Sequence, residues 1–251
     1  YRTVNFWHRQ GAKRVVAARE LSLEEIRQLK EKGDPDLEIE TFVHGAMCIS
    51  ISGRCLLSNY MAAKDANLGA CVHPCRWRYR LVEETRPGEY YPVTEGEEGT
   101  YIFNSKDLCM IEHIPELIEA GISSFKIEGR MKTPLYVAMV TKAYREAIDD
   151  YYTSRELYES RMEHYKEEIS ACTFRQFTTG FYYGKPNEET QIYECNTYVK
   201  NRVYLGTVEE VAEDGSFIIH QKNKFCVGDA IEVMAFDGEN IDVDVLSIRD
   251  E

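Results

Sequence analysis

Four of the eight cysteines lie close together in the chain, between residues 40 and 77. They are Cys48, Cys55, Cys71 and Cys75, and the glycine and serine residues between them let the backbone turn the thiols toward one another at little steric cost. Cysteine thiolates are preferred ligands of zinc and of iron–sulfur clusters. The spacing therefore predicts a metal site, with free buried thiols as the alternative.

The same spacing bears on the kind of metal. A zinc ribbon carries two Cys-x2-Cys pairs, whereas this stretch has Cys-x6-Cys followed by Cys-x3-Cys, which favours an iron–sulfur cluster and keeps zinc as the alternative. We call the stretch from residue 48 to residue 77 the cysteine loop. Cys109 is a fifth candidate ligand, because it is expected at the end of a strand beside this loop. The more scattered cysteines are interpreted as small buried residues: Cys172, Cys195 and Cys226.

Charged residues follow the expected strands and form a second set of candidates. Parallel strands end at one edge of a sheet or barrel, so these side chains are expected to converge on one face, where they are available for acid–base chemistry. Ordinary salt bridges at strand ends are the alternative, and His44 is also interpreted as a metal ligand or as a hydrogen-bonded buried histidine. The set includes Arg19, Glu40, His44, Asp107, Lys126, Glu128 and Arg130.

A basic and aromatic segment follows the last cysteine of the loop. Arg76 and Arg78 alternate with Trp77 and Tyr79, which suits RNA phosphates and a stacked base, although an amphipathic strand gives the same pattern. The net charge of −13 argues against electrostatic binding of nucleic acid over the whole surface, so we expect any RNA contact to use a local basic patch. No Gly-x-Ser-x-Gly, His-Glu-x-x-His or Walker motif occurs.

Strand and helix patterns alternate through the first part of the chain. Strands are expected at 13–20, 37–43, 101–107 and 123–129, and helices at 21–32, at 112–120 and from Pro134 onward, with Ser22 and Thr133 as N-caps. The pattern predicts the C-terminal half of a TIM-like (β/α) barrel, and an open doubly wound sheet is the competing architecture.

Three segments are expected. Residues 1–152 form the partial barrel with the cysteine loop, 153–175 a charged helical connector, and 176–251 a small antiparallel, barrel-like β-domain with hairpin signals at Asp214-Gly215 and at Asp237-Gly238. The chain opens on Tyr1 without a secretory leader or an apolar span, so we expect a truncated piece of a longer cytoplasmic protein with no membrane segment.

Several motifs resemble peptidase family U-32. They are E-T-F-V-H-G-A-M-C-I-S-I-S-G-R-C-L-L-S from Glu40, G-A-C-V-H-P-C-R-W from Gly69, N-S-K-D-L from Asn104, F-K-I-E-G-R-M-K from Phe125 and A-R-E-L-S-L-E-E-I from Ala18. The resemblance implies a TIM-like barrel whose N-terminal half lies upstream. It also implies either a collagenase-like protease, which is a hydrolase, or a hydroxylation factor with a 4Fe-4S cluster, as in tRNA uridine 5-hydroxylation with prephenate as co-substrate.

By this resemblance, Cys48, Cys55, Cys71 and Cys75 match the cluster ligands, and in some relatives the fourth ligand lies near the position of Cys109. The leading expectation is an iron–sulfur enzyme of tRNA 5-hydroxyuridine formation. The alternatives are a peptidase of unassigned mechanism and a non-catalytic module with structural zinc. A half-barrel exposes strand edges, so we expect the isolated chain to self-associate as a homo-oligomer or to be unstable.

Within the leading expectation, roles are assigned from position alone. RNA or a small anionic co-substrate would be held by Arg76, Arg78, Arg130 and Lys132. Acid–base roles would fall to Glu40, His44, Lys126 and Glu128.

Overall fold

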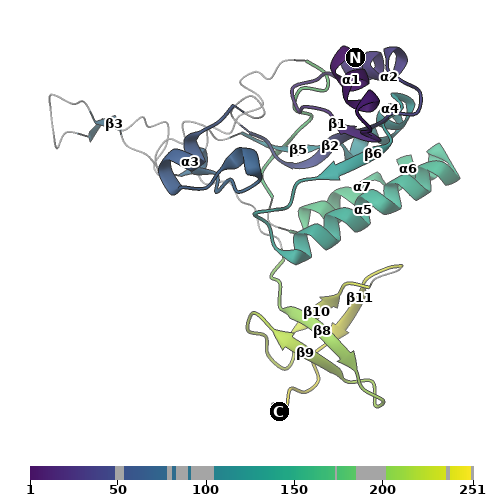
Figure 1. Ribbon diagram of the computed structural model, residues 1–251. Helices are drawn as coiled ribbons and strands as arrows, with labels where there is room; N and C mark the ends of the chain where they lie inside the picture. Colours follow the sequence, from purple (N-terminus) through teal and green to yellow (C-terminus); the bar gives the residue numbers. More distant parts are fainter. Residues whose placement is uncertain are drawn as a thin grey trace. The chain divides into compact units, whose positions relative to one another are not determined.

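The computed structural model describes residues 1–48, 54–77, 81–82, 90–91, 105–172, 174–184, 202–235 and 238–249 (Figure 1). The chain divides into two compact units, Tyr1–Asn201 and Arg202–Glu251. The sequence placed this boundary at 176. The structure keeps Phe177–Thr178 in the first unit, because this strand, β7, pairs with the strand Asp107–Cys109.

A five-stranded mixed sheet forms the centre of the first unit. Its longest strand, β2 (Glu38–Ala46), pairs in parallel with β1 (Arg14–Val16) and with β6 (Ser124–Ile127), and antiparallel with β5 (Asp107–Cys109). Both β1 and β6 pair at Glu40, and both β5 and β6 pair at His44, so β6 occupies one edge of β2 while β1 and β5 share the other. The mixed α/β class is confirmed, and the reversed β5 departs from the all-parallel pattern expected.

Local sequence signals start the helices around this sheet. Ser22 and Glu25 form a capping box at the start of α2 (Leu23–Lys32), as predicted. Thr133 caps α5 (Pro134–Thr153) by accepting a hydrogen bond from Tyr136 N, with Pro134 in the first turn, also as predicted. The charged connector is two helices rather than one, α6 (Arg155–Ser160) and α7 (Met162–Ser170).

Shorter helical segments complete the first unit. Two flank the sheet, α1 (Arg2–Arg9) and α4 (Ile114–Glu119), and a 3-10 turn at Ile111–His113 leads into α4. The cysteine loop contains α3 (Leu57–Ala62) and two 3-10 turns, Ala66–Leu68 and Pro74–Arg76. Downstream of this loop, β3 (Leu81–Val82) pairs antiparallel with β4 (Tyr90–Tyr91).

The core lies between the sheet and α5. Six residues of α5 are buried at helical spacing: Tyr136, Met139, Val140, Ala143, Tyr144 and Ala147. The Tyr144 hydroxyl donates to Val43 O and accepts from Met110 N, both at 2.9 Å, so it links α5 to β2 and to the residue that follows β5. Burying each large apolar side chain of α5 contributes about 1.5–3 kcal/mol to stability. The packing of these side chains and the hydrogen bonds of Tyr144 together hold α5 against the sheet.

The second unit consists of two antiparallel hairpins. One pairs β8 (Gly206–Val211) with β9 (Phe217–Gln221), and the other pairs β10 (Ala230–Val233) with β11 (Ile241–Asp244). The predicted Asp214-Gly215 turn is confirmed, because Gly215 has φ +83° and the Asp214 carboxylate accepts from Ser216 N at 3.0 Å. Within the described residues, no helix combines the length and apolarity needed to cross a lipid bilayer.

Candidate functional site

One face of β2 and β6 carries a line of charged side chains. Along β2, Ile39, Thr41 and Val43 are buried, while Glu40 and Phe42 point to the opposite, less buried face. On that face Lys126 of β6 lies 3.3 Å from Glu40 Oε1, and its ammonium stands 5.3 Å from the centre of the Phe42 ring.

The line continues from Phe42 to the cysteine loop. Arg19, which follows β1, places its guanidinium carbon 3.9 Å from the centre of the Phe42 ring and pairs with Glu128 at 3.4 Å. Glu128 in turn pairs with Arg130 at 3.5 Å. We call the contiguous set the charged row: Glu40, Lys126, Arg19, Glu128 and Arg130.

Glu128 makes contacts through both of its carboxylate oxygens. Its Oε1 accepts from Arg130 N at 2.9 Å, and its Oε2 meets the guanidiniums of Arg19 and Arg130. The side chain is 14% exposed. Gly45 permits this placement, because Gly45 has φ +111° and an added Cβ would lie 2.3 Å from Glu128 O. The enclosed carboxylate of Glu128 therefore holds the guanidiniums of Arg19 and Arg130 in place.

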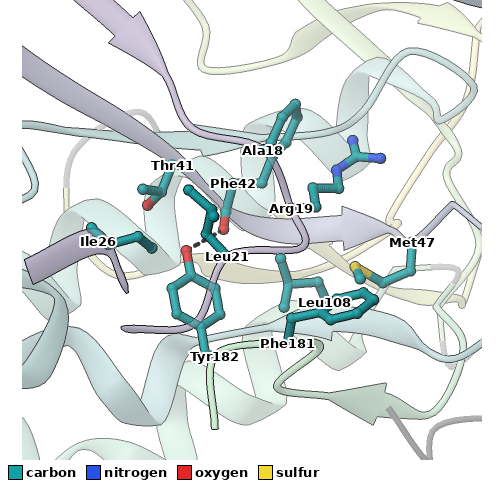
Figure 2. Close-up of a pocket in the computed structure, with 10 residues that line it drawn as sticks. All are labelled: Ala18, Arg19, Leu21, Ile26, Thr41, Phe42, Met47, Leu108, Phe181 and Tyr182. Carbon is teal, nitrogen blue, oxygen red and sulfur yellow. Dashed lines mark hydrogen bonds between the residues drawn. The ribbon is translucent and has the colours of Figure 1, made fainter. Parts of the chain in front are cut away.

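Arg19 also forms a wall of a small pocket (Figure 2). The pocket has room for about one water-sized group, and its other walls are mostly apolar: Ala18, Leu21, Ile26, Thr41, Phe42, Met47, Leu108, Phe181 and Tyr182. Burial lowers the pKa of Arg19, and the nearby charges of Glu128 and Cys48 oppose that shift. The guanidinium is therefore partly desolvated, which strengthens its attraction for an anion.

Arg130 connects the charged row to the cysteine loop. Its Nη1 donates to the carbonyl oxygen of Gly69, two residues before Cys71. Within the loop, Val72 N donates to the buried Ser58 hydroxyl at 3.2 Å, so the part of the loop with Cys55 lies against the part with Cys71 and Cys75. The described part of the loop is thus tied both to itself and to the end of β6.

Glu40 lies at the opposite end of β6 from Glu128. It pairs in register with Ser124 at the start of β6, whereas Glu128 N donates to His44 O beyond the end of that strand. Burial raises the pKa of Glu40, but hydrogen bonds from Ser124 and Lys126, with the charges of Lys126 and Arg14, outweigh it and give a net downward shift. The two carboxylates belong to one row but do not face one another.

His44 and Lys132 lie in the interior rather than on the charged row. His44 is 1% exposed and packs against Tyr136 and Tyr144 of α5, and within the part of the chain that the structure describes its Nε2 has no hydrogen-bond partner. Burial lowers the pKa of His44 to about 4, with the Asp107 carboxylate opposing the shift and Lys132 adding to it. Lys132 Nζ pairs with the buried Asp107 at 3.4 Å.

The predicted metal ligands lie at different depths. Cys48 is exposed, and Cys55, Cys71, Cys75 and Cys109 are half-buried. Four thiols suit an iron–sulfur cluster by their chemistry, yet among the described residues no three or more His, Cys, Asp or Glu side chains are grouped as ligands of one metal. Cys71 Sγ instead accepts a hydrogen bond from His73 N at 3.3 Å.

The basic segment after the loop is described only in part. Arg76 ends the 3-10 turn Pro74–Arg76, and Trp77 is 42% exposed, while Arg78 lies outside the described residues. Sequence reasoning included Arg19 among the charges at strand ends but did not single out Gly45 as a site residue. The available signal for Gly45 was the His-Gly pair at the end of β2.

Comparison with known proteins assigns the chain to a family. The model of "Peptidase family U32" matches residues 1–192, and that of "Peptidase family U32 C-terminal domain" matches residues 200–251. No solved structure matches the chain.

Similar curated proteins carry two kinds of name. The chain is 41% identical over its whole length to "tRNA hydroxylation protein P1" of Bacillus subtilis, covering 59% of that protein, and 37% identical over 94% of its length to "tRNA hydroxylation protein P" of Escherichia coli, covering 60%. It is 34% identical over 76% of its length to "Collagenase" of Porphyromonas gingivalis, covering 47%. The chain spans about three fifths of the first two relatives, and it belongs to peptidase family U32.

Proposed function

We propose that the protein acts in tRNA hydroxylation and forms 5-hydroxyuridine. The observation that carries the proposal is the 37–41% identity, over 94–100% of this chain, to two proteins named for tRNA hydroxylation. Because the chain covers about three fifths of those proteins, the activity is proposed for the full-length protein.

The proposed cofactor is a 4Fe-4S cluster, with zinc as the alternative. It would be held by Cys48, Cys55, Cys71 and Cys75, with Cys109 as the other candidate for the fourth position. A cluster so held would supply one-electron transfer. The proposal is supported by the four-thiol donor set and by the Ser58–Val72 hydrogen bond, which packs two parts of the cysteine loop together.

The charged row suits an anionic co-substrate. Arg19 carries a partly desolvated guanidinium, which attracts a carboxylate, and we propose prephenate as the co-substrate, with Arg19 as a contact for one of its carboxylates. For tRNA, we propose Arg76, Arg78 and Trp77 as the contact segment, with Arg130 at its border. Lys132 is a weaker candidate, because its ammonium pairs with buried Asp107.

The architecture and compartment follow the same proposal. We propose that the mixed sheet is the C-terminal part of a TIM-like barrel completed by the remainder of the full-length protein, and that the protein works in the cytoplasm, where tRNA is found. The unpaired edges of the described sheet support completion by further strands, from the same chain or from a second copy.

The test measures the modified nucleoside directly. Full-length protein, purified without oxygen, is analysed for iron, sulfide and zinc, and its gene is expressed in a bacterial strain that lacks its own tRNA hydroxylation proteins. We expect about four irons per chain, and 5-hydroxyuridine in hydrolysed tRNA by mass spectrometry. Cys55→Ser or Cys71→Ser should remove both iron and the modified nucleoside, while Cys226→Ser, in the second unit, should retain both. Absence of 5-hydroxyuridine with the unmodified protein would overturn the proposal.

A peptidase is the second candidate, because a relative is named "Collagenase". The described residues offer one register-matched thiol and imidazole, Cys109 and His44, which pair across β5 and β2. Burial raises the pKa of Cys109 to about 11, and burial lowers that of His44 to about 4. Thiol proteases need the opposite charges, a thiolate beside a protonated imidazole. Collagen cleavage that persists after removal of iron and stops in Cys109→Ala would restore this candidate.

A further inference from the structure

Glu128 lies where the charged row meets the cysteine loop. Its backbone continues the pairing of β6 with β2, through the hydrogen bond from Glu128 N to His44 O at 2.9 Å. Glu128 is thus part of the central sheet, and its backbone hydrogen bond alone fixes its position relative to β2. Gly45 contributes, since an added Cβ there would also lie 2.9 Å from Glu128 Cβ.

Two guanidiniums share this carboxylate. Arg19, whose side chain is 16% exposed, approaches Oε2 from the end of β1, and Arg130, which is 39% exposed, approaches from the turn after β6. The positive charge of Arg130 contributes to lowering the pKa of Arg19, which means that the two cations repel each other. The Glu128 carboxylate between them is what makes their close approach favourable.

Arg130 then reaches from Glu128 to the cysteine loop. One side of its guanidinium meets the carboxylate and Nη1 donates to Gly69 O, so a single planar group bridges the sheet and the loop. Gly69 has φ +83°, and a Cβ added there would lie 3.6 Å from the same Nη1. The bridged backbone is only two residues from Cys71.

We propose that Glu128 is a positioning residue that docks the cysteine loop against the end of β6 through Arg130, rather than the acid–base group that its place in the sequence indicates. Without the carboxylate, Arg19 would repel Arg130, and Arg130 would leave Gly69. The consequence falls on the loop that carries Cys55, Cys71 and Cys75. This inference rests on the proposed function only in that it concerns the loop with the proposed ligands.

Amide hydrogen exchange of the full-length protein tests the docking. The loop holds amides whose protection reports its order: Gly69 N donates to Ala66 O, Ala70 N to Asp65 O and Val72 N to the Ser58 hydroxyl. In Glu128→Gln and in Arg130→Ala, we expect exchange of the 66–72 peptide to rise at least about tenfold. The double variant should exchange no faster than the faster single variant, because both changes break one chain of contacts.

Two comparisons separate docking from general destabilisation. The peptide of α5, residues 134–153, should keep its exchange rate in every variant, and Glu116→Gln should alter neither peptide, because Glu116 is a 39% exposed carboxylate that pairs with His113 instead. If Glu128→Gln also speeds exchange of the α5 peptide, the Arg130→Lys variant provides the test of docking. A lysine keeps the positive charge but lacks the planar guanidinium that contacts Glu128 and Gly69 together.

Unchanged exchange of the 66–72 peptide in Glu128→Gln or in Arg130→Lys, with α5 protected, would overturn the proposal. Additive acceleration in the double variant would do the same. The experiment uses neither tRNA nor a cofactor measurement, so its failure leaves the proposed function standing. Conversely, absence of 5-hydroxyuridine would leave the docking result standing.

Discussion

At the scale of single residues, His44 gives the clearest dependence on pH. Its pKa is lowered to about 4 from 6.5 by burial, so between these values the unfolded chain binds more protons than the folded one. Stability should therefore be complete above about pH 6.5 and fall as the pH drops through 4. The shift corresponds to a loss on the order of 3 kcal/mol.

Urea unfolding at pH 7.5, 5.5 and 4.5 measures this loss. His44→Gln should be less stable than the wild type at pH 7.5, because the replacement packs less well against Tyr136 and Tyr144, but its loss on acidification should be smaller. Equal losses on acidification in the two proteins would show that other groups control the acid sensitivity.

Among the glycines that the structure describes, Gly45 combines a positive φ with the closest backbone neighbour, so an added methyl group should be most damaging there. In Gly45→Ala the new Cβ would meet Glu128 O and the backbone would be held at φ +111°, so we expect a loss of about 2–4 kcal/mol in the free energy of unfolding. Gly11→Ala is the matched control, because Gly11 has φ +98° but no atom within 4 Å of an added Cβ. Similar losses of stability in both variants would show that backbone strain alone, and not the clash with Glu128 O, causes the effect.

At the scale of elements, one phenol joins α5 to the sheet. Tyr144→Phe should remove the two hydrogen bonds that the hydroxyl makes in the core, while Met110 N still donates to Val43 O at 3.0 Å, which predicts a loss of about 1–3 kcal/mol. Tyr152→Phe, at a 70% exposed position near the end of the same helix, should change stability by less than about 0.5 kcal/mol. Thermal unfolding of the two variants makes the comparison, and equal melting temperatures would contradict it.

The elements also show what local sequence patterns determine. The capping box at Ser22, the Thr133–Pro134 helix start and the Asp214-Gly215 turn each depend on four residues or fewer, and each was predicted. The direction of β5 was not, because whether Asp107–Cys109 pairs parallel or antiparallel with β2 depends on the path of the chain and not on its own residues.

The candidate site likewise has features that local sequence patterns determine and features that depend on the fold. The position of Glu40 in an expected strand was enough to name it as a candidate, but the contact of Arg19 with Glu128 joins positions 109 residues apart and depends on strand register. Charges at strand ends were expected to converge on one face or to form salt bridges, and Asp107 is 1% exposed and pairs with Lys132 in the interior. The roles of the cysteines as ligands stay a prediction.

At the scale of the whole molecule, net charge limits how RNA can bind. With a net charge of −13 on this chain, contacts with the phosphates of the proposed tRNA substrate must come from a few local cations. For the proposed tRNA complex of this chain, the logarithm of the association constant should therefore fall with the logarithm of salt concentration with a shallow slope of about −2 to −4. Filter binding across salt concentrations measures it, and a slope steeper than about −6 would indicate a wide basic surface.

The central place of β2 also has a consequence for synthesis on the ribosome. Glu40 of β2 meets Ser124 of β6, its partner, across 84 residues of chain. At about 5–20 residues per second, translation takes about 4–17 s to cover that distance. During this interval the nascent chain presents the strand Glu38–Ala46, rich in apolar side chains, with its β6 edge open, so ribosome-associated chaperones have several seconds in which to bind it.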